Sequence, residues 1–338
     1  MSKSALPIIA AIFVGMFIGG VSVYRIMLPT GKAPAPPTAL REEITDYRFI
    51  DPLLACNPPE ATTGRYKELD DQLIVLIDNI KEEGRASMVS LYFQEYPSGR
   101  WVGIDENHQY SPASLLKIVL MISYFKDEEL HPGSLNKSYI YTPALDAINS
   151  SIPFDSTSTL TIGASYSTED LVRSMIIDSD NGAKDILLEN VNQETLDKVY
   201  KDMKIPAPNE NQTYTISPRQ YSLFFRILYN ATYLSRTSSE KAMSILAQAK
   251  YPDGLTAGLP KNVTVAHKFG EHVNGDPKRG IDSVELHDCG VVYGPNLPYF
   301  LCVMTTGSTV EGLQSTIKDI SKAVYGALDT NTSGILAQ

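Results

Sequence analysis

The feature that most constrains the fold is a short stretch that would be hydrophobic on every side of a helix. Residues 118–122 are all apolar, and Tyr124 and Phe125 continue the run. A helix with apolar residues all round has to be covered on all sides, unlike a surface helix with one apolar stripe. Just before it, Ser111 suits the N-cap and Pro112 the first helical position, where the missing N–H costs nothing. We therefore expect a helix that begins near Pro112 and runs through the centre of a domain.

The composition is that of an acidic globular chain. The 338 residues include 43% hydrophobic and 20% charged residues, and 29 basic against 39 acidic side chains give a net charge of −10. Basic and acidic residues are equal in number in residues 1–60, so the negative excess lies in residues 61–338. Such a body is a poor general binder of nucleic acid or of anionic lipid surfaces. We therefore expect no nucleic-acid partner.

The three cysteines give no C-x-x-C pair and no zinc-type spacing, and the chain has no H-E-x-x-H motif. We therefore expect no metal site. Cys289 and Cys302 lie on two apolar runs joined by a turn at Gly294-Pro295-Asn296, so a hairpin could bring them close together. A disulfide bond and two small buried thiols in neighbouring strands both fit this pattern.

The N-terminal region predicts a membrane anchor followed by a linker. Residues 4–24 form a run of 21 residues without a charge, which as a helix would span roughly 31 Å, matching a bilayer core. We assign residues 1–28 to an anchor; a cleaved signal peptide is the alternative, although no small-residue cleavage site follows the run closely. Residues 29–63 hold seven of the 21 prolines, which favours an extended linker. The globular domain would then occupy residues 64–330.

Hydrophobic periodicity in this domain indicates strands near both ends and helices between them. Helical spacing of apolar residues links Leu69 to Ile80 and, near the C-terminus, Val310 to Val324. The strand-like runs are residues 88–96, 100–104, 263–270, 284–293 and 299–306, and the clearest helical segments between them are 168–178, 182–191 and 218–230. Two early and three late strands predict an α+β domain with one mostly antiparallel, five-stranded sheet flanked by helices. The residues from about 111 to 250 would form a mainly helical subdomain.

Ser114 and Lys117 are the first candidates for catalysis. Three residues apart at the start of a helix, they share one face. Burial disfavours a charged lysine and can lower its pKa towards the roughly 7 to 8 expected of a working base. A neutral amine can take the proton of a serine hydroxyl, and the positive end of the helix favours the negative charge that develops. The same Ser-x-x-Lys spacing also occurs at Ser134, Ser238 and Ser315, so the spacing is not specific by itself.

Two further motifs follow in the chain. Ser179-Asp180-Asn181 falls between two predicted helices, where polar side chains can project into a cleft, although a simple polar turn has the same pattern. Lys268-Phe269-Gly270 ends a strand with alternating apolar residues, which is also typical of an ordinary edge strand. Taken in this order, the three motifs resemble those of the serine β-lactamase and penicillin-binding-protein superfamily, with class A β-lactamases nearest. The order of strands and helices over about residues 64–328 resembles that fold as well.

The resemblance implies a β-lactamase/transpeptidase-like fold and an acyl-enzyme formed on Ser114 from β-lactams or D-Ala-D-Ala-like amides. Lys117 would be the base for Ser114. Ser179 would pass a proton to the leaving nitrogen. Asn181 would hydrogen-bond the amide side chain of the substrate.

The third motif would bind and polarise the substrate. Lys268 would attract a substrate carboxylate, and the N–H groups of Ser114 and Glu271, beside Gly270, would form the oxyanion hole. No metal or organic cofactor is implied. The partners would be a β-lactam or a peptidoglycan peptide and, through the N-terminal helix, a membrane, with the body on the extracytoplasmic side, periplasmic or at the cell surface.

Two positions depart from the family pattern. Phe269 stands where the family usually has Thr or Ser, whose hydroxyl meets the substrate carboxylate. The loop before Ser217-Pro218 lacks Glu-x-x-Leu-Asn, whose glutamate activates the water that frees the acyl-enzyme, and its one glutamate, Glu210, is close to the helix start. Three functions therefore stay open: a β-lactamase, a DD-peptidase or transpeptidase, and a non-catalytic receptor domain that binds β-lactams or peptidoglycan.

Overall fold

The computed structural model describes residues 40–41, 47–55, 66–142, 160–208, 214–276, 280–294 and 296–333. All of them belong to one compact unit, Ala39–Gln338. The predicted anchor in residues 1–28 lies outside the described residues. Within the described ranges, no helix has both the length and the apolar character required to cross a bilayer.

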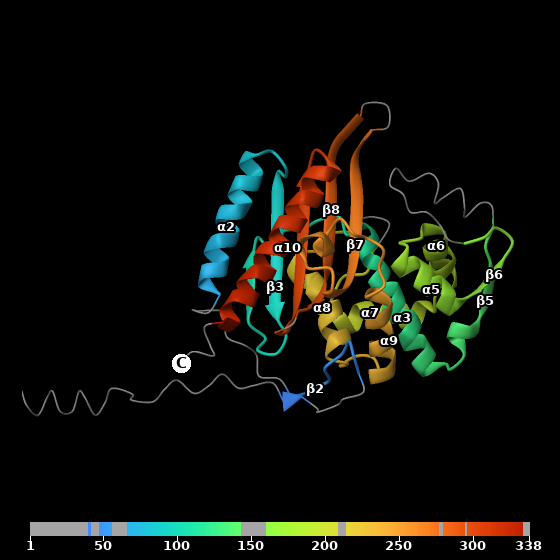
Figure 1. Ribbon diagram of the computed structural model, residues 1–338. Coiled ribbons are helices and arrows are strands. Elements are labelled where there is room, and N and C mark those ends of the chain that lie inside the picture. Colours follow the sequence, from blue (N-terminus) through green and yellow to red (C-terminus); the bar gives the residue numbers. More distant parts are fainter. Residues whose placement is uncertain are drawn as a thin grey trace, which may run out of the picture. The chain divides into compact units, whose positions relative to one another are not determined.

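The centre of the unit is an antiparallel sheet with strand order β4-β3-β9-β8-β7 (Figure 1). Its strands are β3 (Met88–Glu95), β4 (Trp101–Ile104), β7 (Thr264–Asp276), β8 (Gly280–Tyr293) and β9 (Pro298–Gly307). The predicted α+β class and five-stranded sheet are therefore confirmed. Strands β8 and β9 lie between β3 and β7. Side chains from distant parts of the sequence can therefore meet on one sheet.

Helices cover both faces of this sheet, which explains why β3 and β9 are buried along nearly their whole length. On one face lie α2 (Lys67–Glu82) and α10 (Val310–Ser333), whose apolar stripes pack into one hydrophobic cluster. On the other face lies α8 (Pro218–Tyr229), part of a second and larger cluster. The sequence periodicity predicted α2, α8 and α10 because each presents one apolar stripe to the sheet.

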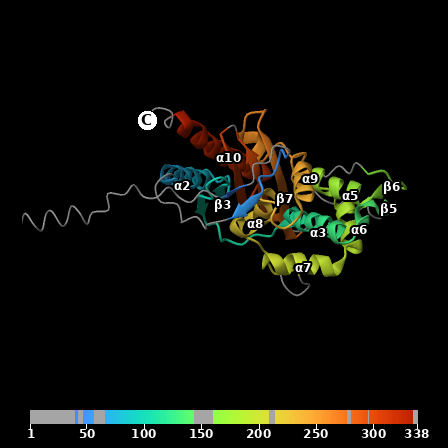
Figure 2. The same cartoon turned by 90° about the horizontal axis from the view of Figure 1, so that it is seen from below.

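The helical subdomain surrounds α3 (Lys117–Leu130), which is buried on all sides as its sequence requires. Its other helices are α5 (Thr168–Ile177), α6 (Asn181–Asn190), α7 (Gln193–Met203) and α9 (Arg236–Leu246), and a small sheet of β5 (Ser138–Ile140) and β6 (Ser165–Ser167) lies beside them (Figures 1 and 2). α5 starts with a reciprocal capping box between Ser167 and Asp170. This cap fixes the helix that ends just before Ser179.

The segment predicted to be a linker is not extended along its whole length. Residues 47–52 pack on the body: Glu240 accepts the backbone N–H groups of Arg48 and Phe49, and Ile50 is buried in the larger cluster. Strands β1 (Leu40–Arg41) and β2 (Leu53–Ala55) pair on either side of this segment. The sequence did not predict this packing, because prolines favour an extended linker and a single buried apolar residue, Ile50, gives no hydrophobic periodicity.

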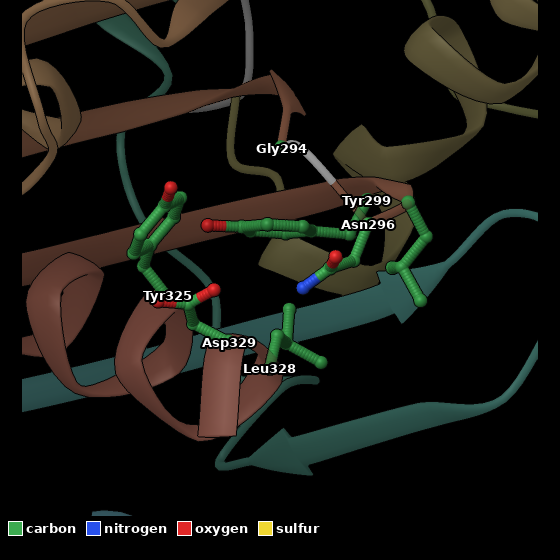
Figure 3. Close-up of a pocket in the computed structure, with 7 residues that line it drawn as sticks. Gly294, Asn296, Tyr299, Tyr325, Leu328 and Asp329 are labelled. Carbon is green, nitrogen blue, oxygen red and sulfur yellow. The ribbon is translucent and has the colours of Figure 1, made fainter. Parts of the chain in front are cut away.

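Two further features complete the fold. Cys289 and Cys302 lie directly opposite each other on β8 and β9 and form a disulfide. A small pocket between the β8–β9 turn and the end of α10 is shown in Figure 3 and has a volume of about 10 Å³, room for one water molecule. The buried Tyr299 hydroxyl at this pocket has no hydrogen-bond partner among the described residues, so a single water is the occupant that the space and the chemistry suit.

Candidate active site

The turn that carries Ser114 is tighter than the sequence predicted. Residues Ala113–Leu116 form a 3-10 helix, and the α-helix α3 begins only at Lys117. Ser111 makes no side-chain cap; the residue before the 3-10 helix is Pro112. Residues three apart eclipse each other in a 3-10 helix, so the tighter turn keeps Ser114 and Lys117 on one face.

Two polar side chains of β8 hold the start of this turn. Glu285 Oε2 accepts the Ser111 N–H at 3.0 Å, and His287 Nε2 donates to the Ser111 carbonyl oxygen at 3.0 Å. The Thr305 N–H points at His287 Nδ1, which makes Nδ1 the acceptor and Nε2 the donor. Ala113, two residues on, has a φ of 47°, a strained value for a residue with a Cβ. We call these two hydrogen bonds that Glu285 and His287 make with the Ser111 backbone the clamp. The clamp holds the turn in this strained backbone conformation.

Gly270 lets β7 approach the turn closely. A Cβ at this position would lie 2.9 Å from the Pro112 carbonyl oxygen and 3.1 Å from the Leu115 backbone nitrogen. Both are backbone atoms that cannot move aside. The glycine therefore places the backbone of β7 directly against the turn on either side of Ser114, as a two-residue oxyanion hole requires.

Lys117 points into the second motif. Its Nζ donates to the Ser179 carbonyl oxygen at 2.6 Å, to Ser179 Oγ at 3.1 Å and to Asn181 Oδ1 at 2.8 Å. Ser114 is half-buried, and its Oγ makes no hydrogen bond within the described ranges. The amine is thus held at the second motif while the hydroxyl one turn away is left for a ligand.

The Ser179-Asp180-Asn181 motif forms the junction between α5 and α6. Ser179 has a φ of 56°, and Asp180 caps α6 by accepting the Ala183 N–H at 2.8 Å. The left-handed backbone at Ser179 turns the chain sharply, so that the side chains of Ser179 and Asn181 both reach Lys117. Asp180 therefore supports the junction, and its neighbours face the site.

Lys268 reaches the same serine from β7. Its Nζ donates to Ser179 Oγ at 3.0 Å and to the Phe269 carbonyl oxygen at 3.0 Å, and it lies 4.1 Å from the centre of the Phe269 ring. Phe269 in turn stacks on Tyr251, with ring centres 4.1 Å apart and an interplanar angle of 14°. The aromatic side chains therefore cover the flank of Lys268 where the family pattern has a hydroxyl.

The charges of this site are set mainly by burial. Burial holds the pKa of Lys117 well below its usual value, and the nearby charges of Lys268 and Lys184 lower it further. Burial also lowers the pKa of Lys268 to about 7, against the opposing effect of Asp288. Two amines whose pKa values burial lowers thus flank the hydroxyl of Ser179.

Glu271 adds an acid at the edge of the site. Burial raises the pKa of its carboxyl to about 7, and its Oε1 is buried with no hydrogen-bond partner among the residues that the structure describes. A carboxyl in this state is about half protonated at neutral pH. The resemblance assigns the backbone N–H of the same residue to the oxyanion hole, an arrangement that would put the charge of Glu271 next to the reacting oxygen.

The structure brings together Lys117, Ser179, Asn181 and Lys268 through direct hydrogen bonds, and it sets Gly270 and Glu271 against the turn that carries Ser114. Glu210 lies outside the described residues. Glu285 and His287 were not predicted from the sequence, although their alternation with the apolar Val284 and Leu286 was a usable signal for a polar contact. In the described ranges, no group of acidic, histidine or cysteine side chains is arranged to hold a metal ion.

Comparison with known proteins gives one family. A model of the β-lactamase enzyme family matches residues 72–328. Among curated proteins, no relative matches the chain at a significant level.

Solved structures with the same fold include a point mutant of PBP-A as its acyl-enzyme complex with penicillin G. It is 20% identical, with a TM-score of 0.64, and the match covers 81% of this chain and 100% of that one. A class A β-lactamase from Mycobacterium abscessus is 18% identical, with a TM-score of 0.63, over 77% of this chain and 99% of that one. A β-lactamase from Xanthomonas campestris pv. campestris is also 18% identical, with a TM-score of 0.63, over 77% and 98%. These matches establish the fold.

Proposed function

The chain belongs to the β-lactamase enzyme family of serine hydrolases, and we propose that it forms its acyl-enzyme on Ser114, with Lys117, Ser179 and Lys268 moving the protons. The observation that carries this proposal is the pair of hydrogen bonds to Ser179 Oγ, from Lys117 Nζ at 3.1 Å and from Lys268 Nζ at 3.0 Å. Side chains from three distant parts of the sequence thereby meet at one hydroxyl.

The first step is the attack of Ser114 on a carbonyl carbon. Neutral Lys117, whose pKa burial depresses, takes the Ser114 proton while the new C–O bond forms. The N–H groups of Ser114 and Glu271 bind the oxyanion, an interaction worth roughly 3 to 4 kcal/mol per donor in serine hydrolases. The C–N bond then breaks: Ser179 delivers its proton to the leaving nitrogen and receives in return, through its hydrogen bond with Lys117, the proton that Lys117 took from Ser114. Water finally hydrolyses the ester and frees Ser114.

Asn181 and Lys268 position the substrate in this scheme. Asn181 accepts one Lys117 hydrogen bond, and its amide group would hydrogen-bond the substrate's amide side chain. Lys268 supplies positive charge beside Ser179, but its flank is covered by Phe269. We therefore propose β-lactams and D-Ala-D-Ala-like amides as the substrate class, with weaker selection for the substrate carboxylate than a hydroxyl at residue 269 would give.

A DD-peptidase or transpeptidase is the second candidate. What favours it is the sequence before Ser217-Pro218, which lacks the Glu-x-x-Leu-Asn pattern whose glutamate activates water for hydrolysis of the acyl-enzyme. An acyl-enzyme that reacts slowly with water can instead be transferred to an amine. A receptor domain that only binds β-lactams would keep its adduct or form none.

Intact-mass analysis of the full chain after exposure to penicillin tests these assignments. We expect a mass increase equal to one penicillin, absent in Ser114→Ala and kept in Ser111→Ala, the matched loss of a hydroxyl from the same turn. Labelling of Ser114→Ala would refute the nucleophile. The lifetime of the adduct separates the candidates: rapid loss indicates a β-lactamase, while a persistent adduct together with release of D-alanine from a pentapeptide mimic indicates a peptidase.

We also propose that residues 4–24 anchor the enzyme in a membrane, with the catalytic domain on the extracytoplasmic side. The uncharged run of 21 residues supports this assignment, and so does the proposed substrate class, which occurs outside the cytoplasm. Alkaline extraction of membranes from cells that make the full chain, or a chain starting at Ala39, provides the test. Release of the full chain into the soluble fraction would contradict the anchor, and resistance to protease added to intact cells would contradict its orientation.

A further inference from the structure

A second cavity lies at the opposite edge of the sheet from Lys268. It has a volume of about 530 Å³, within the range of small-molecule sites. It is bounded by β3 and β4, by the end of α7 and by the first two turns of α8. Since β4 and β7 are the two edge strands of a five-stranded sheet, four strand spacings, about 19 Å, separate this cavity from the strand that carries Lys268.

The floor of the cavity contains a hydrogen-bond acceptor without a donor. Gln94 is 6% exposed, and its Nε2 donates to the Gly99 carbonyl oxygen at 3.1 Å. Its Oε1 is buried and has no partner among the described residues. Two residues before it on the same face of β3, Tyr92 packs its ring 5.7 Å from that of Trp101. A buried amide oxygen left unpaired is costly, so this floor suits a ligand that brings an N–H or O–H group.

The walls of the cavity are cationic. Arg219 and Arg226 lie seven residues apart on one face of α8, and Lys204 lies at the end of α7; among the described residues, no acidic side chain lines the cavity with them. The Arg219 guanidinium stacks over the Trp101 ring at 4.8 Å, and Glu106, outside the lining, lies 3.5 Å from it and offsets part of its charge.

The other two cations have no such neighbour. Among the described residues, Arg226 and Lys204 have no carboxylate within ion-pair distance. Arg219 and Arg226 both act electrostatically on the Tyr92 hydroxyl: burial raises the pKa of Tyr92, and the two positive charges oppose this rise. Three cations that share a cavity whose described lining holds no acid are unexpected in a chain with a net charge of −10, where random placement would mix the signs.

We propose that this cavity is a binding site for an organic anion, separate from the acylation site. Arg226, Lys204 and Arg219 would hold its carboxylate or phosphate oxygens by charge-assisted hydrogen bonds, and Gln94 Oε1 would accept from an N–H or O–H group of the same molecule. The faces of Trp101 and Tyr92 would contact its apolar part. An acidic peptide and a phosphorylated compound share this chemistry.

Trp101 makes the proposal directly testable because it is the only tryptophan in the chain. The intrinsic fluorescence of the full chain would be titrated, at constant ionic strength, with inorganic phosphate and with N-acetyl-Glu-Glu as a dicarboxylate that also carries amide N–H groups. We expect a saturable change in Trp101 fluorescence in the millimolar range or below. Tighter binding of N-acetyl-Glu-Glu would assign the site to acidic peptides, and tighter binding of phosphate would assign it to phosphorylated ligands. No saturable change with either probe would overturn the proposal.

Variants distinguish binding in this cavity from non-specific attraction of anions to surface cations. Arg226→Gln is expected to weaken binding about tenfold or more, since it removes a charged hydrogen-bond donor. Gln94→Glu should also weaken it by adding a negative charge at the floor. Lys201→Gln is the matched control: it removes a cation from the same end of α7 but from outside the lining, so binding should stay within about twofold. An equal loss in Lys201→Gln and Arg226→Gln would overturn the proposal. Penicillin labelling of Ser114 should be unchanged in all three variants, which makes failure of this site distinguishable from failure of the catalytic assignment.

Discussion

At the scale of single residues, the site depends on what burial does to three ionisable groups. Lys117 and Lys268 are both deprived of solvent and donate to the same hydroxyl of Ser179. Their pKa values fall, while that of Glu271 rises to about 7. Near neutral pH the site can therefore change its charge without any change in fold, because desolvation has moved the pKa values of Lys268 and Glu271 to about 7.

Glu271 makes the acylation rate fall relative to a variant without its charge as the pH rises through about 7. Below this pH, Glu271 is neutral and Lys268 is charged, which favours an anionic intermediate; above it, Glu271 is charged and Lys268 is neutral, which disfavours one. Deprotonation of the base Lys117 acts in the opposite direction in both proteins, so the comparison with Glu271→Gln isolates the carboxyl: we expect equal rates at acid pH and a several-fold higher rate than in the unaltered protein above pH 7. The rate of penicillin labelling, followed by mass spectrometry from acid to alkaline pH, provides the measurement. An unchanged profile in Glu271→Gln would show that this carboxyl does not act on the intermediate.

A stability measurement checks the same pKa shift independently. The Glu271 carboxyl binds its proton more tightly in the folded chain than in the unfolded chain, where its pKa is near 4.5. Its contribution to the free energy of unfolding is therefore fully present below that pH and is lost as the pH rises through about 7. The difference in unfolding free energy between Glu271→Gln and the unaltered chain should accordingly change across this pH window and be constant above it.

At the scale of elements, the feature that positions Ser114 is the clamp between β8 and the 3-10 turn. His287 and Glu285 each make one hydrogen bond to the backbone of Ser111, at 3.0 Å. The turn they hold contains Ala113 with a φ of 47°, a conformation that costs of order 1 to 3 kcal/mol. These contacts therefore act on the reaction through the position of Ser114 without reaching the substrate.

We expect His287→Ala to lower the rate constant of acylation by about tenfold to a hundredfold, because small displacements of a nucleophile have effects of this size. The dissociation constant of the non-covalent penicillin complex should change little, since the contacts of His287 within the described residues are with Ser111, Tyr110, Thr305 and its neighbours on the sheet. Stopped-flow labelling at several penicillin concentrations separates the two constants. His287→Gln, whose amide N–H can donate to the Ser111 carbonyl, should recover part of the rate. A loss confined to penicillin affinity would contradict a positioning role.

Sequence periodicity predicts the elements well where an apolar stripe meets the core, and it fails where a distant contact decides the geometry. The stripe from Leu69 to Ile80 and the buried run at 118–122 lead directly to α2 and α3. The 3-10 turn at Ala113–Leu116 could not be predicted, because the residues that hold it, Glu285 and His287, lie more than 170 positions away. The same holds for the ends of β7 and β8, which extend beyond the apolar alternation into polar residues.

At the scale of the whole molecule, the catalytic motifs are spread over more than 150 residues, and the sheet order brings them together. The order of the three motifs resembles that of a known family, and this resemblance predicts that they share one site; the structure joins Lys117 and Lys268 to Ser179 by hydrogen bonds. Their hydrogen-bond partners were not predictable. Asn181 and Ser179 both receive donors from Lys117 only because Ser179 adopts a left-handed backbone, which no local sequence signal requires.

The packed segment at residues 47–52 contributes to the stability of the domain. Ile50 is 7% exposed, the Asp51 N–H donates to the Tyr229 carbonyl oxygen at 2.8 Å, and the Tyr293 hydroxyl donates to the Phe49 carbonyl oxygen at 2.7 Å. Burial of one isoleucine and these hydrogen bonds together stabilise the fold by about 3 kcal/mol. A chain that starts at residue 61 should therefore melt roughly 6 to 10 °C below one that starts at Ala39.

Thermal unfolding followed by circular dichroism measures this difference. Ile50→Ala in the longer chain should reproduce part of the loss, because it removes the buried side chain and keeps the backbone hydrogen bonds. Both chains should still be labelled by penicillin at temperatures where they are folded, since none of these contacts involves Ser114. Equal melting temperatures for the two chains would mean that residues 47–52 act only as the linker that their proline-rich surroundings predict.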